Sequence, residues 1–232
     1  MTDTIELQTI QVTGKAEGPH LLITGGVHGD EFESMTAIRR LAIAVDASEL
    51  SGRLTLVPVV NEAAFLAGNR TAEDGLDLAR VCPGDPEGSV TLRTAVALSQ
   101  LIESADYYID LHSGGIIMDV WPMSGYGLSD DPAILDVQRR MAHAFNLPVI
   151  WGTAGNLNGR SLSVARDAGV AAIYTEYLGG GRCSPEGADA YFAGCLNVMA
   201  ELELLKRERP ASAVTLQIED PRPGSGHMQV QN

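Results

Sequence analysis

The chain has 232 residues, of which 45% are hydrophobic and 20% are charged, an ordinary composition for a soluble globular protein. Its formal net charge of −14 opposes binding to the phosphates of nucleic acid or to an anionic membrane, so we exclude both as partners. We expect one compact domain, because a chain of this length buries roughly 70% of the surface that it exposes when unfolded.

Signals for export and for disulfides are missing from the sequence. No apolar run is long enough to cross a bilayer, and the N-terminal segment is acidic where a signal peptide would be basic and then apolar. The three cysteines match no metal-finger spacing, and their odd number argues against a disulfide framework. We therefore expect a cytoplasmic protein with reduced thiols. The sequence leaves open whether copies of the chain form a homo-oligomer.

Short apolar runs alternate with longer helical patterns along the chain. The runs are typical of strands buried on both faces, and they lie at residues 21–24, 54–60, 107–111, 149–151 and 170–175. Helices with recognisable starts are predicted between them, at residues 30–45, 90–102, 132–145 and 185–209. This alternation predicts an α/β fold with a largely parallel sheet, in which ligands bind beyond the carboxyl ends of the strands.

The last part of the chain has a different pattern. Residues 213–218 alternate like a strand, residues 220–226 predict a turn, and residues 227–230 alternate again. Two short strands alone are marginal in water, so they either pack on the main domain or begin a second β-domain. We predict a main domain over residues 1–210 and a C-terminal β segment over residues 211–232.

A glycine-rich segment, Gly-Gly-Val-His-Gly-Asp-Glu, follows the first predicted strand and leads into the first predicted helix. It contains His28 and Glu31, whose spacing of three residues would place both side chains on one face of a helical turn. An imidazole and a carboxylate form half of a common zinc site, and the glycines would let the backbone approach a ligand closely. The segment equally fits a turn with solvated side chains that cap the helix.

Two further polar side chains lie at the ends of predicted strands. His112 follows the strand at residues 107–111 and would complete a His₂Glu set, which leaves one zinc position open for water. Glu176 ends the strand at residues 170–175, where a carboxylate beside a metal would be a natural general base. Considered alone, Glu176 is better explained as a carboxylate in a salt bridge at the rim of the fold than as a general base.

Together these segments resemble the succinylglutamate desuccinylase/aspartoacylase family of the zinc carboxypeptidase superfamily. The resemblance rests on Gly-Gly-x-His-Gly-Asp-Glu at 25–31, Asp-Leu-x-Arg at 77–80, Asp-Leu-His-Ser-Gly at 110–114 and the late Glu176 before three glycines. It implies a three-layer zinc-carboxypeptidase-like fold with a mostly parallel, mixed central sheet. Residues 1–210 would then be a zinc-hydrolase catalytic domain.

The resemblance also implies roles for the metal site and for catalysis. His28, Glu31 and His112 would bind one Zn²⁺ ion per chain. Glu176 would be the general base and would later protonate the leaving amine. Independently of the resemblance, Glu33 is the next residue to test if Glu176 is not the base. In the same comparison, Asp77 would hold the ring of His28.

Two arginines would bind the substrate if the resemblance holds. Arg70 would polarise the scissile carbonyl, and Arg80 would bind a substrate carboxylate with its guanidinium fork. Ala79 replaces the asparagine that the family usually has beside this arginine, which removes one hydrogen-bond donor. By contrast, we expect Arg160 to form a structural ion pair.

The predicted function is therefore that of a zinc-dependent deacylase acting on a small, anionic N-acyl amino acid or a related acyl amide. Two alternatives remain open. A metallocarboxypeptidase would share the metal site but would need a clamp for a peptide C-terminus, which Ala79 weakens. A metal-binding protein without turnover would have no use for Glu176.

Overall fold

A computed structural model describes residues 5–226 of the chain. The elements, in chain order, are β1 (Ile10–Thr13), β2 (Ala16–Thr24), α1 (Phe32–Ala44), β3 (Ser51–Val57), α2 (Glu62–Ala67), the short 3₁₀ helix η1 (Leu78–Arg80), α3 (Val90–Glu103), β4 (Tyr107–Leu111), β5 (Asp119–Gly127), α4 (Pro132–Phe145), β6 (Val149–Thr153), α5 (Ser161–Asp167), β7 (Ala171–Gly179), α6 (Pro185–Glu201) and β8 (Leu216–Glu219).

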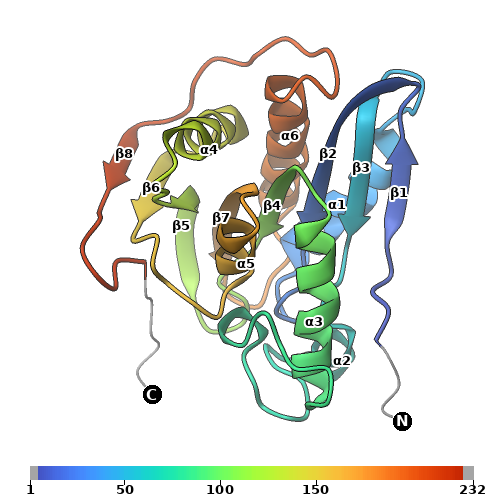
Figure 1. Cartoon of the computed structure of the whole chain (residues 1–232), viewed down its shortest axis with the longest axis vertical. Helices are drawn as coiled ribbons and strands as arrows, with labels where there is room; N and C mark the ends of the chain where they lie inside the picture. Colours follow the sequence, from blue (N-terminus) through green and yellow to red (C-terminus); the bar gives the residue numbers. More distant parts are fainter. Residues whose placement is uncertain (1–4, 227–232) are drawn as a thin grey trace.

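One eight-stranded sheet lies at the centre of the fold, in the order β1-β3-β2-β4-β7-β5-β6-β8 (Figure 1). Its neighbouring strands are parallel, except that β1 is antiparallel to β3 and β5 is antiparallel to β7. The prediction of a mixed, mostly parallel sheet is thus confirmed. The adjacent strands β2, β4 and β7 all run in one direction, so their carboxyl ends meet at the same edge of the sheet.

Helices cover both faces of the sheet and form two hydrophobic cores. On one face, α1, α4 and α6 pack on residues such as Ile23, Ile109 and Ile173. On the other face, α3 and α5 pack on residues such as Leu22 and Tyr108. Successive side chains of a strand thus pack into the cores on opposite faces of the sheet, which explains why the strands are almost continuously apolar. No helix in residues 5–226 is long and apolar enough to cross a membrane.

All five apolar runs form strands of the sheet, but β1 and β5 were not predicted from the sequence. The stretch that forms β5 contains Pro122, Gly125 and Gly127, which disfavour strand formation when local preference alone is considered. Gly125 is needed at its position, because a Cβ there would lie 2.4 Å from the ring of Tyr174 on β7. The tertiary packing of β5 against β7 therefore outweighs the local preference.

The end of α6 differs from the prediction. The helix stops at Glu201, not near residue 209, because Glu203 adopts the left-handed conformation with φ of 63°. The chain then turns so that the carbonyl of Leu204 accepts a hydrogen bond from the backbone N–H of Ser51. The side chain of Leu204 is thereby buried without a continued helix.

The C-terminal strand β8 extends the central sheet, pairing in parallel with β6 at the edge opposite β1 (Figure 1). It is shorter than the predicted strand at residues 213–218 and begins later. The strand predicted at residues 227–230 lies outside the described residues. The division of the chain at residue 210 stays a prediction.

Candidate active site

The turn after β2 brings His28 and Glu31 to the carboxyl edge of the sheet. Its backbone is anchored to β3, where the N–H of Gly25 donates to the carbonyl of Val57. A Cβ on Gly29 would lie 2.2 Å from the carbonyl carbon of Ala64, so only glycine lets this turn pack directly against α2. Glu31 then forms the N-cap of α1, and its side chain makes no capping hydrogen bond.

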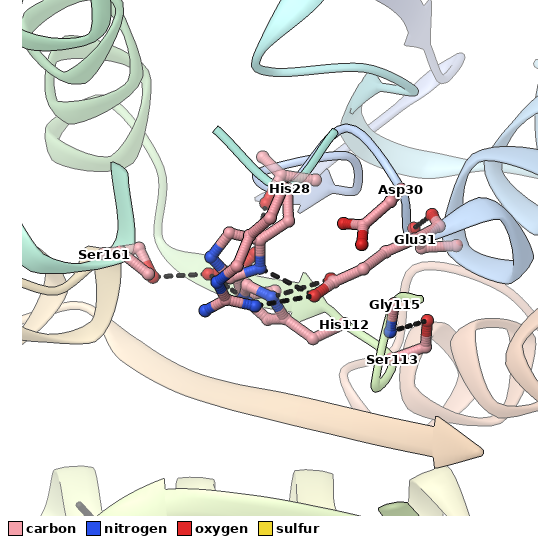
Figure 2. Close-up of polar contacts among 12 residues, drawn as sticks. His28, Asp30, Glu31, His112, Ser113, Gly115 and Ser161 are labelled. Carbon is pink, nitrogen blue, oxygen red and sulfur yellow. Dashed lines mark hydrogen bonds and ion pairs between the residues drawn. The ribbon is translucent and has the colours of Figure 1, made fainter. Parts of the chain in front are cut away.

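His28, Glu31 and His112 form one buried cluster, shown in Figure 2. The Glu31 carboxylate lies between the two rings: Oε1 is 2.6 Å from His28 Nδ1, and Oε2 is 3.0 Å from His112 Nδ1. Candidate ligand atoms of the three residues all lie within 4.8 Å of one another. Two imidazoles and one carboxylate at this separation are a donor set that suits zinc.

Each histidine ring contacts a second carboxylate with its other nitrogen. His28 Nε2 lies 3.0 Å from Asp77 Oδ1, and His112 Nε2 lies 3.1 Å from Asp110 Oδ2. Both Nδ1 atoms therefore face the centre of the cluster, and carboxylates orient both rings from behind, as is usual for metal-binding histidines. This orientation is the second observation that fits a metal ion at the centre.

From the sequence, a partner is predicted for His28 but none for His112. Asp110 precedes His112 by two residues at the end of a strand, a spacing that places side chains on one face and would have indicated the contact. Asp110 also accepts hydrogen bonds from the hydroxyls of Thr24 and Ser161. Its position behind the ring is therefore fixed by three elements.

The carboxylates raise the proton affinity of both rings. Burial by itself would lower the pKa of His28, but Glu31 and Asp77 outweigh that effect and raise it above its usual value. In the same way, burial would lower the pKa of His112, but Asp110 and Glu31 raise it well above its usual range. Such surroundings favour a positive charge at the site, which a metal ion supplies when it displaces these protons.

Arg70 is held beside the cluster by Asp77. Its Nη2 atom donates to Asp77 Oδ2 at 3.0 Å, and Nη1 lies 3.6 Å from Glu31 Oε1. The other oxygen of Asp77 accepts the backbone N–H of Ala79 and thus caps η1. One carboxylate therefore fixes a histidine, an arginine and the backbone of the segment that carries Arg80.

Glu176 lines the same cavity as the cluster, from the central strand β7. Its Oε2 atom is buried and has no hydrogen-bond partner among residues 5–226. Burial raises the pKa of Glu176 to about 8, although nearby His112 opposes this shift. Glu33 does not line the cavity; its Oε1 instead accepts the N–H of Ser184 at the start of α6.

The cavity has a volume of about 650 Å³ and is also lined by Arg80 and Arg160. Neither guanidinium pairs with a carboxylate in the described part of the chain: Arg80 donates to the carbonyl of Ala79, and Arg160 to that of Gly226. The expectation of a structural ion pair for Arg160 is therefore wrong. Arg160 is the N-cap residue of α5, and burial together with the nearby Arg80 lowers its pKa.

The catalytic-domain model of the succinylglutamate desuccinylase/aspartoacylase family matches residues 17–202. The chain belongs to this family. Family membership confirms the resemblance based on the motifs and the expected fold. Apart from Gly226, the residues that line the cavity lie within the matched stretch.

Three relatives illustrate the similarity. The N-alpha-acetyl-L-2,4-diaminobutyric acid deacetylase of Halomonas elongata is 35% identical over 206 residues, covering 86% of this chain and 59% of that protein. The structure of a succinylglutamate desuccinylase/aspartoacylase from Rhodobacter sphaeroides has a TM-score of 0.82 and 31% identity, covering 90% of this chain and 62% of the other. The product-bound ectoine utilization protein EutE (DoeB) from Ruegeria pomeroyi has a TM-score of 0.83 and 31% identity, covering 89% and 64%. The chain therefore spans about three fifths of the length of these relatives.

Proposed function

We propose that this protein is a zinc-dependent hydrolase that removes the acyl group, such as acetyl, from a small N-acyl amino acid. One observation carries the proposal: a single cavity is lined by the His28, Glu31 and His112 cluster and by Glu176, whose Oε2 has no partner among residues 5–226. Hydrolysis of an amide needs an activated water and a group that moves its proton to the amine. The cluster and Glu176 supply one requirement each.

Zinc, when bound by the three residues, would supply the Lewis acidity that lets water act as a nucleophile near neutral pH. The positive charge of a bound zinc ion, like that of His112, would lower the pKa of Glu176, so its ionised carboxylate would accept a proton from that water as the water oxygen bonds to the acyl carbon. It then gives the proton to the nitrogen as the carbon–nitrogen bond breaks. Arg70 donates hydrogen bonds to the carbonyl oxygen as negative charge develops there, an electrostatic effect that is large in a site shielded from water.

The charges of the cavity support an anionic substrate. The protein carries a net charge of −14, yet Arg80 and Arg160 both face the cavity without a carboxylate partner among residues 5–226. A guanidinium binds a carboxylate through two parallel hydrogen bonds, so these residues would hold the carboxylate of an amino acid. The Halomonas elongata relative, whose name describes removal of acetyl from an amino acid, supports the same substrate class.

A substrate panel tests the proposal. The panel contains Nα-acetyl-L-2,4-diaminobutyrate, N-acetyl-L-aspartate, N-succinyl-L-glutamate and an N-blocked dipeptide, each assayed for release of a free amine. We expect turnover of at least one acyl amino acid, loss of turnover after chelation and recovery on addition of zinc. Turnover of the dipeptide alone would identify a metallocarboxypeptidase. No turnover with zinc bound would identify a binding protein.

A further inference from the structure

Asp30 is a buried carboxylate in the cavity wall that the proposed reaction does not use. It lies between the candidate ligands His28 and Glu31 on the same turn (Figure 2), and the residue is only 4% exposed. Its Oδ2 atom accepts the backbone N–H of Ile116 at 2.9 Å. Its Oδ1 atom is buried and has no partner among residues 5–226.

The turn after β4 holds this carboxylate in place. A Cβ added to Gly115 would lie 2.5 Å from Oδ2 and 2.9 Å from Oδ1, so the backbone of the turn packs directly on Asp30. Gly115 has a φ of 57°, a conformation that glycine adopts without strain. The side chain is therefore fixed in position before any ligand binds, which favours binding of a ligand by Oδ1.

Other carboxylates in the cavity wall already have partners. Glu31 contacts both histidines, Asp77 contacts His28 and Arg70, and Asp110 contacts His112 and two hydroxyls. Glu176 has its proposed role in moving a proton. Asp30 forms no ion pair with any basic side chain in the described part of the chain. Because leaving a buried polar atom unpaired costs free energy, the partner of Oδ1 is best supplied by the ligand.

We propose that Asp30 binds the side-chain ammonium group of the substrate, which is then an N-acyl diamino acid. This inference rests on the proposed deacylase function and defines its substrate class. The cavity would bind opposite charges at two places: Arg80 and Arg160 would receive a carboxylate, and Asp30 an ammonium. The Halomonas elongata relative carries the name of such a substrate, an acetylated diamino acid.

The test compares two substrates that differ only at the proposed contact. Nα-acetyl-L-2,4-diaminobutyrate ends in an ammonium group, whereas Nα-acetyl-L-norvaline has a methyl group in its place. Asp30→Asn keeps an oxygen for the N–H of Ile116 but removes the charge. We expect kcat/KM for the diamino substrate to fall by about 10- to 100-fold, as for loss of a charge-assisted hydrogen bond, and that for the norvaline substrate to stay within about threefold.

Asp131→Asn is the matched control, since Asp131 is an exposed N-cap residue of α4 outside the cavity. It should change neither value. An equal fall for both substrates in Asp30→Asn would show that Asp30 only shapes the turn and would overturn the inference. No change for either substrate would also overturn it. Zinc content should be equal in all three proteins.

A binding experiment separates this inference from the proposed function. Calorimetry measures the Kd of L-2,4-diaminobutyrate and of L-norvaline for the zinc-loaded wild type and for Asp30→Asn. We expect the wild type to bind the diamino acid more tightly by about 10-fold or more, and Asp30→Asn to lose this preference. If no acyl amino acid of the panel is hydrolysed, the proposed function fails, yet this preference still tests Asp30. Equal affinities in the wild type would overturn the inference.

Discussion

His28 and Asp77 are in contact at 3.0 Å, between Nε2 and Oδ1, although 49 residues separate them in the sequence. The contact turns Nδ1 of His28 toward Glu31. Because Asp77 also binds Arg70, the orientation of a candidate metal ligand and the position of a candidate catalytic arginine depend on one carboxylate.

Asp77→Asn should therefore weaken both zinc binding and catalysis. An amide oxygen still accepts one hydrogen bond, but it has no charge to favour the hydrogen-bonded ring of His28 or the guanidinium of Arg70. We expect the affinity for zinc to fall by about 10- to 100-fold, measured by competition with a chelator of known affinity. Asp85→Asn, outside the cavity, should leave it unchanged.

His112→Ala should remove most of the bound metal. Two ligands in place of three leave an incomplete zinc site, and loss of a ligand should exceed the ~10- to 100-fold effect of losing an outer partner. Metal content by plasma emission should fall from one zinc per chain to a small fraction. His143→Ala is the control, because His143 lies on α4 and contacts Gln217 outside the cluster. Equal zinc in wild type and His112→Ala would refute the assignment.

Glu176→Gln should keep the zinc and the fold but lower kcat by about 10²- to 10⁴-fold, because an amide cannot accept the proton of water. Glu33→Gln tests the next candidate base. Since the Glu33 carboxylate contacts the start of α6 and does not line the cavity, its variant should retain kcat within about threefold. Full kcat in Glu176→Gln together with a large loss in Glu33→Gln would identify Glu33 as the general base.

Arg80→Ala and Arg160→Ala should each raise KM for a carboxylate substrate by about 10-fold, with a smaller effect on kcat. The reason is that loss of a uniform binding interaction affects substrate and transition state alike. Arg39, an exposed arginine of α1, provides the matched Arg39→Ala control. Substrates with an amidated carboxylate should be poor for the wild type and little affected by the variants. Equal turnover of acid and amide by the wild type would contradict a carboxylate clamp.

Glu219 should stabilise the docking of β8 in a pH-dependent way. Arg139 hydrogen bonds to both of its oxygens and, together with Tyr126, holds the pKa of Glu219 below its usual value. Its stabilising effect, about 1 kcal/mol or less for such an exposed pair, is present above the unfolded pKa near 4.5 and is lost as the pH falls through the lower folded pKa.

Hydrogen exchange of the β8 amides measures this effect. Glu219→Gln should lower their protection factors at pH 7 by a few-fold, and the wild type should approach the variant when the pH falls below the folded pKa. Glu208→Gln, an exposed carboxylate outside β8, should behave as the wild type. A wild-type protection factor that stays above that of Glu219→Gln by the same ratio at low pH would contradict the prediction.

The sequence by itself determined the features that depend on near neighbours. Apolar runs gave the five strands, and the N-cap and proline signals located the starts of α4 and α6. The contact between His28 and Glu31 follows from their spacing in one turn. The motifs placed His28 and His112 at the ends of two strands, and parallel strands have their carboxyl ends at one edge.

Tertiary structure decided which distant residues meet. Nothing local indicates that β5 lies antiparallel to β7, because Gly125 disfavours a strand locally and is required only by the packing of Tyr174. The end of α6 depends on a hydrogen bond between Leu204 and Ser51, and the exposure of Arg160 to the cavity depends on the position of α5. Likewise, only the packing of the turn after β4 buries Asp30 and leaves its Oδ1 without a partner in the described part of the chain. Local preferences act over a few residues, whereas burial and charge pairing act between whatever residues the fold brings into contact.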